Sequence, residues 1–397
     1  MSGLRTERVV LASVIFVTLL AQVLLYPGVP EIVEGLGATT DLDASMWFLA
    51  AEFGSFIVCA GIWGYLSDRT GTRIPYIALG AGIAATCYFI LTVGGIVAEF
   101  SFGTVILLRI IQGAGSVAAF SLAMTMLMDL EGGHGQNMGA AGIAIGLGTA
   151  FGAPSGGLLA GVNPLAPLLA AGILFVTIPP LLLLVSDRAP TPDSSTIRTV
   201  LRDLRRYPEL GIPYTFGFID RMTAGTFSLV GVFFFRDAFG LDAAQTGVML
   251  FLFFGPFALL QYPFGRLSDR FGRFLPVVGG SICYGSMVIA FGQAPSLVLA
   301  GAILLGVGIF GAVVSPATMA LVTDIAPTTR HGTAMAGFNI AGSLGFLTGI
   351  LLGGVVAGAY GNPMAFAVIG SAELLIALIA LPWFRRVLPH SRYRMNA

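Results

Sequence analysis

Twelve runs of about 20 predominantly apolar residues follow one another along the chain, separated by short polar segments. A helix of about 20 residues rises about 30 Å, which is the thickness of the hydrocarbon core of a membrane. The chain is 56% hydrophobic and only 10% charged, a balance that excludes an ordinary soluble domain. We therefore expect an all-α membrane protein of twelve transmembrane helices. The expected helices span 9–29, 46–66, 75–97, 103–127, 138–160, 164–186, 211–235, 244–264, 274–293, 296–322, 332–358 and 363–384.

The basic residues are distributed unevenly between the two sides that these helices define. All 20 of them are Arg. If both termini are cytoplasmic, every Arg in a loop lies on the inner side except Arg236. Positive charge is enriched on cytoplasmic loops of membrane proteins. We therefore expect a multi-pass protein of the plasma (cytoplasmic or inner) membrane, with both termini in the cytoplasm.

An internal repeat divides the chain into two halves. The stretch "GYLSDRTGTR" at 64–73 is matched by "GRLSDRFGRF" at 265–274, and each stretch follows the second apolar run of its half. Asp129 and Asp324 also correspond, because each follows the fourth run. The longest polar interruption, 187–208, separates the halves. We expect two pseudo-symmetric six-helix bundles from one duplicated unit. Their ranges are 1–186 and 209–397, with 187–208 as a cytoplasmic linker.

The doubled G-x-L-x-D-R-x-G pattern resembles that of the major facilitator superfamily, and the likeness extends over the whole chain. "RIIQGAG" at 109–115 resembles the arginine motif of the fourth helix in that family. "GTAFGAPSGG" at 148–157 resembles the fifth-helix motif of its antiporters, with the proline one position later than usual. The pattern is most similar to that of proton-coupled drug and multidrug antiporters. The fifth-helix motif residues are Gly148, Gly152, Pro154, Gly156 and Gly157.

The resemblance implies that the repeated loops form a cytoplasmic gate, which latches the two halves together in one state of an alternating-access cycle. Glycine allows the tight turn, Asp68 can cap the next helix, and an Arg of the loop can pair with Asp129. The alternative is that these charges only set the orientation in the membrane. The gate residues are Gly64, Asp68, Arg69, Gly71, Arg73 and Asp129 in the first half and Gly265, Asp269, Arg270, Gly272 and Asp324 in the second.

Five ionisable residues lie inside expected transmembrane helices, where charge is unfavourable without a partner or a water-filled cavity. Glu52 and Arg109 lie at similar depth and can pair. Asp220 and Arg221 are neighbours that point about 100° apart, so only one of them can face a central pathway. Burial favours the protonated form of a carboxyl group, which suits a proton carrier. Glu52, Arg109, Asp220 and Arg221 are the expected pathway and proton-coupling residues, with static ion pairs as the alternative.

The fifth residue, Glu373, is the weaker candidate, because the twelfth helix is usually peripheral in the family. Polar or aromatic residues of the helices are candidates for contact with a substrate, although isolated polar side chains also occur for packing. They are Gln22, Tyr26, Gln112, Gln261, Tyr262 and Asn339.

These features favour a secondary active transporter, monomeric in the bilayer, for proton-coupled export of small lipophilic or drug-like molecules. One alternative is a proton symporter that imports a sugar or carboxylate. Another is a membrane receptor or sensor built on the same scaffold. The chain has no Lys and no phosphate-binding loop, and its three Cys and three His show no metal-ligand spacing. We expect no enzyme activity, no cofactor, no metal and no nucleic-acid partner.

Overall fold

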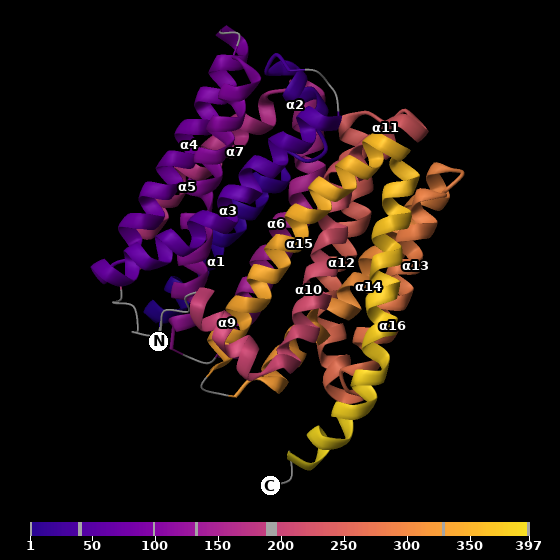
Figure 1. The fold of residues 1–397 in the computed structure, drawn as a ribbon. Helices are drawn as coiled ribbons and strands as arrows, with labels where there is room; N and C mark the ends of the chain where they lie inside the picture. Colours follow the sequence, from indigo (N-terminus) through magenta and orange to yellow (C-terminus); the bar gives the residue numbers. More distant parts are fainter. Residues whose placement is uncertain are drawn as a thin grey trace. The chain divides into compact units, whose positions relative to one another are not determined.

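A computed structural model of the chain describes residues 2–38, 42–97, 100–131, 134–187, 197–327 and 330–394 (Figure 1). The described residues are almost entirely helical and contain no strand. Within them, eleven helices are long and apolar enough to cross a membrane, and a shorter apolar pair covers Ala166–Leu182. That pair occupies the position of the expected sixth crossing, so the all-α membrane fold is confirmed. The expected linker lies outside the described residues at 188–196.

The chain forms two compact units. The first contains residues 1–196 and 227–258. Its helices are α1 (Ser2–Val23), α2 (Val29–Gly35), α3 (Leu42–Thr70), α4 (Ile74–Val97), α5 (Phe102–Asp129), α6 (His134–Val162), α7 (Ala166–Val176), α8 (Ile178–Leu182), the π-helix η2 (Phe227–Gly231), α11 (Val232–Phe239) and the first part of α12 (Ala243–Phe271).

The second unit contains residues 197–226 and 259–397. It includes the rest of α12 together with α9 (Ile197–Arg206), the 3-10 helix η1 (Pro208–Leu210), α10 (Gly211–Thr226), the π-helix η3 (Leu275–Gly279), α13 (Gly280–Gly292), α14 (Leu297–Ile325), α15 (His331–Tyr360) and α16 (Asn362–Arg394).

Helix pairing within the two units repeats. In the first unit α1 packs on α6, and α4 packs on both α5 and α7. In the second unit α10 packs on α15, and α13 packs on both α14 and α16. These are equivalent pairs, because the helices after the linker follow one another in the same order as those before it. The duplication inferred from the repeated loops is therefore present in the packing.

Glycines bring the backbones of equivalent pairs close together. A side-chain carbon at Gly148 of α6 would lie 3.0 Å from the carbonyl oxygen of Phe16 on α1. Gly152 and Gly156 face Val23 and Leu24 of the same partner. In the second unit Gly345 and Gly349 of α15 similarly face the backbone of α10. Small residues permit such close helix packing in membranes, where no hydrophobic force drives helices together. Gly148, Gly152 and Gly156 of the fifth-helix motif therefore lie on the α1 face of α6, whereas Pro154 and Gly157 lie against Gly247 and Ala243 of α12.

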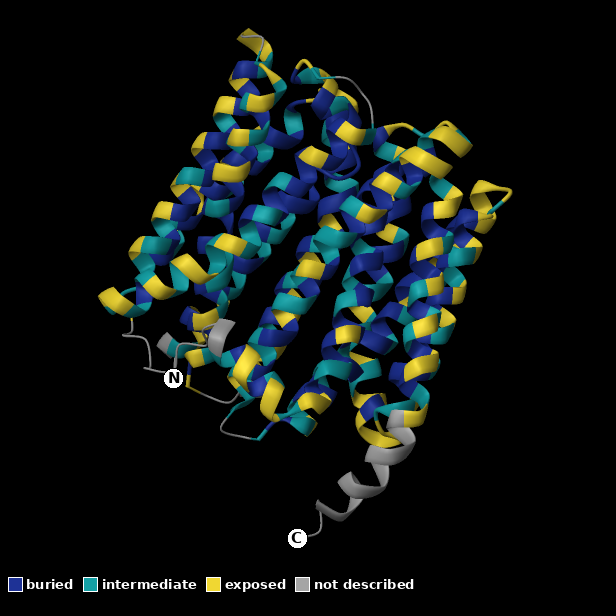
Figure 2. Ribbon diagram, in the orientation of Figure 1, coloured by how far each residue is buried: buried dark blue, intermediate teal, exposed yellow. Residues whose placement is uncertain are grey.

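Apolar side chains also cover much of the exposed surface. Figure 2 marks the exposed residues on the helices of both units in yellow. On α4, Ile90, Val93 and Val97 are exposed, and on α16 Leu375 and Ile379 are exposed. In water such stripes are unfavourable, but hydrocarbon chains are as apolar as these side chains. Both helices therefore carry faces suited to lipid.

The helix of the linker, α9, packs within the second unit. Leu204 lies against an apolar cluster formed by α14, α15 and the start of α10. Asp203 is buried and lies 3.6 Å from the guanidinium of Arg330. The remaining Arg side chains of its described part, Arg202, Arg205 and Arg206, are exposed. This helix is thus anchored to the protein by its apolar face.

Candidate functional site

A buried ion pair joins α3 to α5 in the first unit. Arg109 and Glu52 are 0% and 1% exposed, and the guanidinium donates to the Glu52 carboxylate. Arg109 also donates to Oε1 of Gln112 over 2.5 Å and to the carbonyl oxygen of Phe48 over 3.3 Å. Its cationic carbon lies 4.3 Å from the centre of the Phe48 ring. The charge of each partner is therefore compensated without water.

Gln112 completes this network. Its amide nitrogen donates to the other carboxylate oxygen of Glu52 over 3.3 Å and to the Ser116 hydroxyl over 2.6 Å. Spacings of three and four residues place Arg109, Gln112 and Ser116 on one face of α5. Gly113 lets α3 approach, because a side-chain carbon there would lie 2.7 Å from the Glu52 carbonyl oxygen. The motif "RIIQGAGS" thus encodes both the polar network and the close helix contact.

Three expected substrate residues lie on the helices that form this network or beside them. Gln112 belongs to the network itself, and Tyr26 of the buried segment after α1 interacts electrostatically with Glu52 and Arg109. Gln22, one turn earlier, is buried, and its amide nitrogen has no hydrogen-bond partner among the described residues. Buried amides without partners are uncommon. Gln22 therefore has hydrogen-bonding capacity to offer a ligand.

The other three expected substrate residues lie elsewhere. Gln261 is half-buried on α12, and Asn339 is exposed on α15. Tyr262 is 67% exposed and is covered by the guanidinium of Arg266, which lies 4.6 Å from its ring centre. The structure does not gather these three residues at the Glu52–Arg109 network. Their role in binding stays a prediction.

Asp220 and Arg221 are neighbours on α10, and their side chains point in different directions, as helix geometry requires. Asp220 is 5% exposed, whereas Arg221 is half-buried and extends along α15 beside Gly342. The two residues form no ion pair with each other. Glu373 of α16 is completely buried rather than peripheral, and it interacts with Asp220. The signal for Glu373 was present in the sequence, since an acid in an apolar run needs a specific environment.

The repeated loop of the first unit is held by two aspartates. Gly71 has a φ of +70°, the left-handed conformation that glycine adopts readily, and it ends α3. Arg73 is buried and donates to Asp129 over 2.5 Å. The expectation that Asp68 caps the next helix is wrong. Asp187 accepts the backbone N–H groups of Arg73 and Ile74 at 3.0–3.2 Å.

Asp68 does not cap the next helix because α3 is longer than expected. Because α3 continues to Thr70, Asp68 lies in its last turn and makes no hydrogen bond to another described residue. Gly64 is helical for the same reason, and a side-chain carbon there would meet no described atom within 4 Å. The turn therefore requires Gly71 but not Gly64. Arg69 is exposed.

The equivalent loop of the second unit uses an arginine that the repeat alignment missed. Gly272 has a φ of +82° and corresponds to Gly71, while Gly265 is helical. Arg273 donates to Asp324 over 2.8 Å, to Asp269 over 2.6 Å and to the Ser268 hydroxyl over 2.7 Å. Arg270, like Arg69, is exposed. The arginine shifts by one position between the copies, so the residue-by-residue match could not identify Arg273.

A further ion pair of the first unit was not expected. Arg236 on α11 pairs with Glu31 on α2. Arg236 was distinctive in the sequence as the only Arg expected in an outer loop, but nothing indicated its partner. The pair joins two segments that both precede a loop on the expected outer side.

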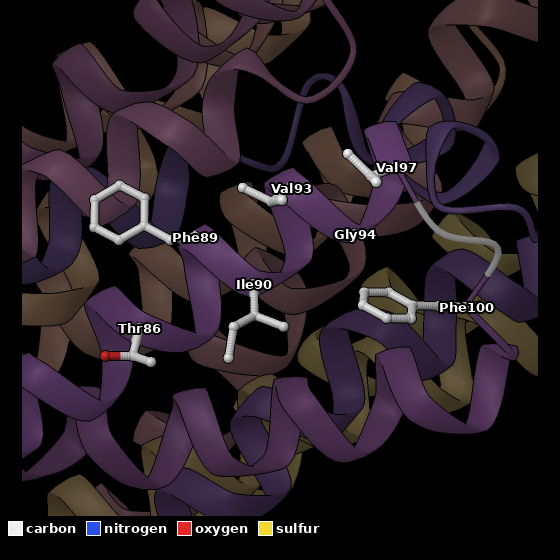
Figure 3. Close-up of a pocket in the computed structure, with 7 residues that line it drawn as sticks. All are labelled: Thr86, Phe89, Ile90, Val93, Gly94, Val97 and Phe100. Carbon is white, nitrogen blue, oxygen red and sulfur yellow. The ribbon is translucent and has the colours of Figure 1, made fainter.

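The structure also has a hollow on the apolar surface of the first unit (Figure 3). Its walls come from α4 and the segment before α5, and Thr86 supplies the hydroxyl group among them. The lining residues are Thr86, Phe89, Ile90, Val93, Gly94, Val97 and Phe100. It includes no expected substrate residue and is suited to an acyl chain rather than a polar ligand.

Known proteins of one family resemble this chain in sequence. The profile described as Major Facilitator Superfamily matches residues 11–235 and 214–394. An uncharacterized MFS-type transporter of Methanocaldococcus jannaschii is 33% identical over 160 residues, which are 38% of this chain and 42% of that relative. The class G tetracycline resistance protein of Vibrio anguillarum is 26% identical over 351 residues, covering 83% of this chain and 84% of that protein.

A solved structure shares the fold. The crystal structure of a bacterial homolog to the human lysosomal transporter Spinster, in an inward-facing and unoccupied conformation, superposes with a TM-score of 0.76. The alignment covers 98% of this chain and 97% of that one at 15% sequence identity. At this identity the likeness is informative about fold alone.

Proposed function

This chain belongs to the major facilitator superfamily of membrane transporters, and we propose that it exports small lipophilic organic molecules in exchange for protons. The observation that carries the coupling part of the proposal is the buried Glu52–Arg109 pair. The likeness to a tetracycline resistance protein over 83% of the chain supports the substrate class. Transport by alternating access is the activity of this family of membrane transporters.

The pair can couple a proton to a change of structure. With Glu52 ionised, its carboxylate is the acceptor for Arg109 and Gln112. A proton on Glu52 removes its charge and leaves Arg109 as an uncompensated buried cation, which is strongly unfavourable. Arg109 must then rearrange, or an anionic group must replace the carboxylate. Proton binding is thereby linked to the packing of α3 on α5.

The repeated loops would act as inner gates in this cycle. Arg73 with Asp129, and Arg273 with Asp324, each tie a loop to the end of the fourth crossing of the same half. Arg273 also pairs with Asp269 at the end of α12. Release of such a tie lets the loop move relative to its bundle. The arginine asymmetry supports an orientation with these loops and both termini in the cytoplasm, in the plasma membrane. We propose a working monomer divided at 187–208.

Reconstituted vesicles test this function. The purified protein is placed in liposomes with an acidic lumen, and the uptake of tetracycline, of a fluorescent lipophilic cation and of a radiolabelled hexose is followed. Exchange against protons predicts that the acidic lumen drives uptake of tetracycline or the cation, and that a protonophore abolishes it. Movement of these probes that is indifferent to the pH gradient would contradict proton coupling.

A matched pair of variants tests whether the Glu52–Arg109 network couples transport to protons. Glu52→Gln should abolish gradient-driven uptake while still inserting into the membrane. Glu209→Gln makes the same chemical change at an exposed position and should transport normally. Uptake of the hexose together with protons from the same side would instead support an importing symporter.

A further inference from the structure

Helix α16 of the second unit buries a carboxyl group, that of Glu373, which is 0% exposed. Gly370, Ala377 and Ala380 lie three, four and seven residues away and are also buried, so they share one face of the helix with Glu373. Leu375, on the opposite face, is exposed. Glu373 therefore lies on the packed, small-residue side of α16 and not on the side suited to lipid.

Helix α13 lies directly against this side. A side-chain carbon at Gly285 of α13 would lie 2.7 Å from the carbonyl oxygen of Gly370 and 3.0 Å from Cβ of Glu373. A side-chain carbon at Gly370 would likewise lie 2.6 Å from the carbonyl oxygen of Gly285. Ile219 of α10 packs with Ile369 in an apolar cluster on the neighbouring face. The two backbones are thus in contact beside Glu373, in apolar surroundings.

No described group donates a hydrogen bond to Glu373. Neither of its carboxyl oxygens has a hydrogen-bond partner in the described part of the chain. Ser281 of α13 is fully buried and interacts with Glu373 without reaching hydrogen-bond geometry. By contrast, both oxygens of Glu52 have donors. A negative charge on Glu373 would therefore be buried without compensation, which is strongly unfavourable.

The titratable groups on the elements packed against α16 do not supply this compensation. Arg221 of α10 extends beside Gly342 of α15, and His331 is the first residue of α15. Asp220 of α10 and Tyr284 of α13 are buried, and neither of these side chains can carry a positive charge. The other titratable residues in the described parts of these elements and of α14 are Tyr214, Cys283, Asp324 and Tyr360.

A carboxyl group that is out of water and has no donor is most stable in its neutral form. We propose that Glu373 carries a proton at physiological pH, and that the contact between α13 and α16 holds this proton in place. Glu373 is then a proton-binding site of the second unit that ionises only when the contact opens and water reaches the carboxyl group. This inference goes beyond the coupling role proposed for Glu52. It concerns proton binding alone, so it is tested without a substrate.

Infrared spectroscopy of the purified full-length protein tests the protonation, because a protonated carboxyl group has a C=O stretching band that a carboxylate lacks. The spectra are recorded between about pH 5 and about pH 9, where exposed glutamates are largely ionised and buried ones titrate. We expect a band at neutral pH that Glu373→Gln removes and that Asp220→Asn and the exposed control Glu209→Gln leave in place. A band that survives Glu373→Gln, that is lost in Asp220→Asn, or that is absent at neutral pH would overturn the proposal.

A second pair of variants tests the role of the helix contact. Gly285→Ala places a methyl group against the backbone of α16, so α13 and α16 must separate beside Glu373. Gly280→Ala is the matched control, because a side-chain carbon there would lie 2.8 Å from Val314 of α14, on another face of α13. The Glu373 band should titrate about 1 pH unit or more lower in Gly285→Ala and remain unchanged in Gly280→Ala. Equal titration in the two variants would overturn the role of the contact.

Unfolding midpoints in detergent establish that each variant is folded. If the amide of Glu373→Gln is not tolerated, Glu373→Leu removes the acid with a side chain suited to the apolar surroundings. If Gly285→Ala does not fold, Gly370→Ala makes the same change from the other helix. All of these outcomes are independent of vesicle transport, so failure here leaves the exporter hypothesis intact.

Discussion

Each unit buries a carboxyl group, but the groups that surround it differ between the two units. In the first unit Glu52 receives a guanidinium and an amide, so both of its oxygens have donors. In the second unit Glu373 is 0% exposed and has no hydrogen-bond donor among the described residues. The first arrangement compensates a negative charge on the carboxylate, whereas the second offers no donor that would do so.

This difference indicates how a duplicated scaffold acquires unequal halves. The helix pairs that build the units are equivalent, but the ionised network joins the second and fourth crossings of its half. Glu373 instead lies on the sixth crossing of the other half. Packing was retained after duplication while the chemistry diverged. Stability and proton binding should therefore respond differently to substitutions in the two units.

The largest effect is expected for Arg109→Met. The substitution leaves Glu52 buried without its cation, and breaking a buried ion pair costs about 3–5 kcal/mol. The midpoint of thermal unfolding in detergent should fall strongly. Arg221→Met is the matched control, because Arg221 makes no ion pair with a described residue, and its cost should be about 1 kcal/mol or less. Equal losses in the two variants would remove the distinction between the centres.

A double variant tests whether Arg109 and Glu52 contribute to stability as a pair. Combining Arg109→Met with Glu52→Leu removes both charges and leaves an apolar contact. Replacement of a buried pair by apolar residues is often neutral or stabilising. The double variant should therefore recover most of the lost stability while remaining unable to couple protons. Additive destabilisation would indicate that the two side chains are independent.

An intermediate effect is expected at the two loops. Arg73 is 4% exposed, whereas Arg273 is half-buried, and the aspartate partners of both are exposed. Arg73→Ala should cost about 1–3 kcal/mol, and Arg273→Ala about 1 kcal/mol or less. Chemical denaturation of the reconstituted protein measures both. The effect of Arg273→Ala should also weaken more with added salt, because exposed charges are screened.

The smallest effect separates two glycines of one motif. Gly71 needs its left-handed conformation, so Gly71→Ala should cost about 1–2 kcal/mol. Gly64 is helical and unobstructed, so Gly64→Ala should leave stability unchanged or raise it slightly. Unfolding midpoints of the two variants give the comparison. A larger loss at Gly64 would mean that its close neighbour lies outside the described residues.

Sequence periodicity predicted the fold because each crossing needs only an apolar run of sufficient length. Eleven of the twelve expected crossings begin within four residues of the start of an observed helix, and the repeat indicated the duplicated packing. Helix extensions were harder to predict. The α3 helix continues through Gly64 and Asp68, since a polar residue does not end a helix once it leaves the hydrocarbon. The capping role of Asp187 depends on a contact across 113 residues, which no local pattern reveals.

The chemistry of the site was predictable only in part. The spacing of Arg109, Gln112 and Ser116 on one helix face is visible in the sequence, and the depth of Glu52 indicated its partner. The burial of Glu373 depends on how closely α16 packs against α13, which glycines such as Gly285 and Gly370 permit.

The contrast between the centres can be measured in one experiment, the infrared band of protonated carboxyl groups at neutral pH in Glu52→Gln and Glu373→Gln. If Glu52 is ionised by its pairing with Arg109 and the donor-free Glu373 is protonated, Glu52→Gln leaves the band unchanged and Glu373→Gln removes it. Loss of the band in Glu52→Gln, or its persistence in Glu373→Gln, would contradict the division into an ionised and a protonated centre.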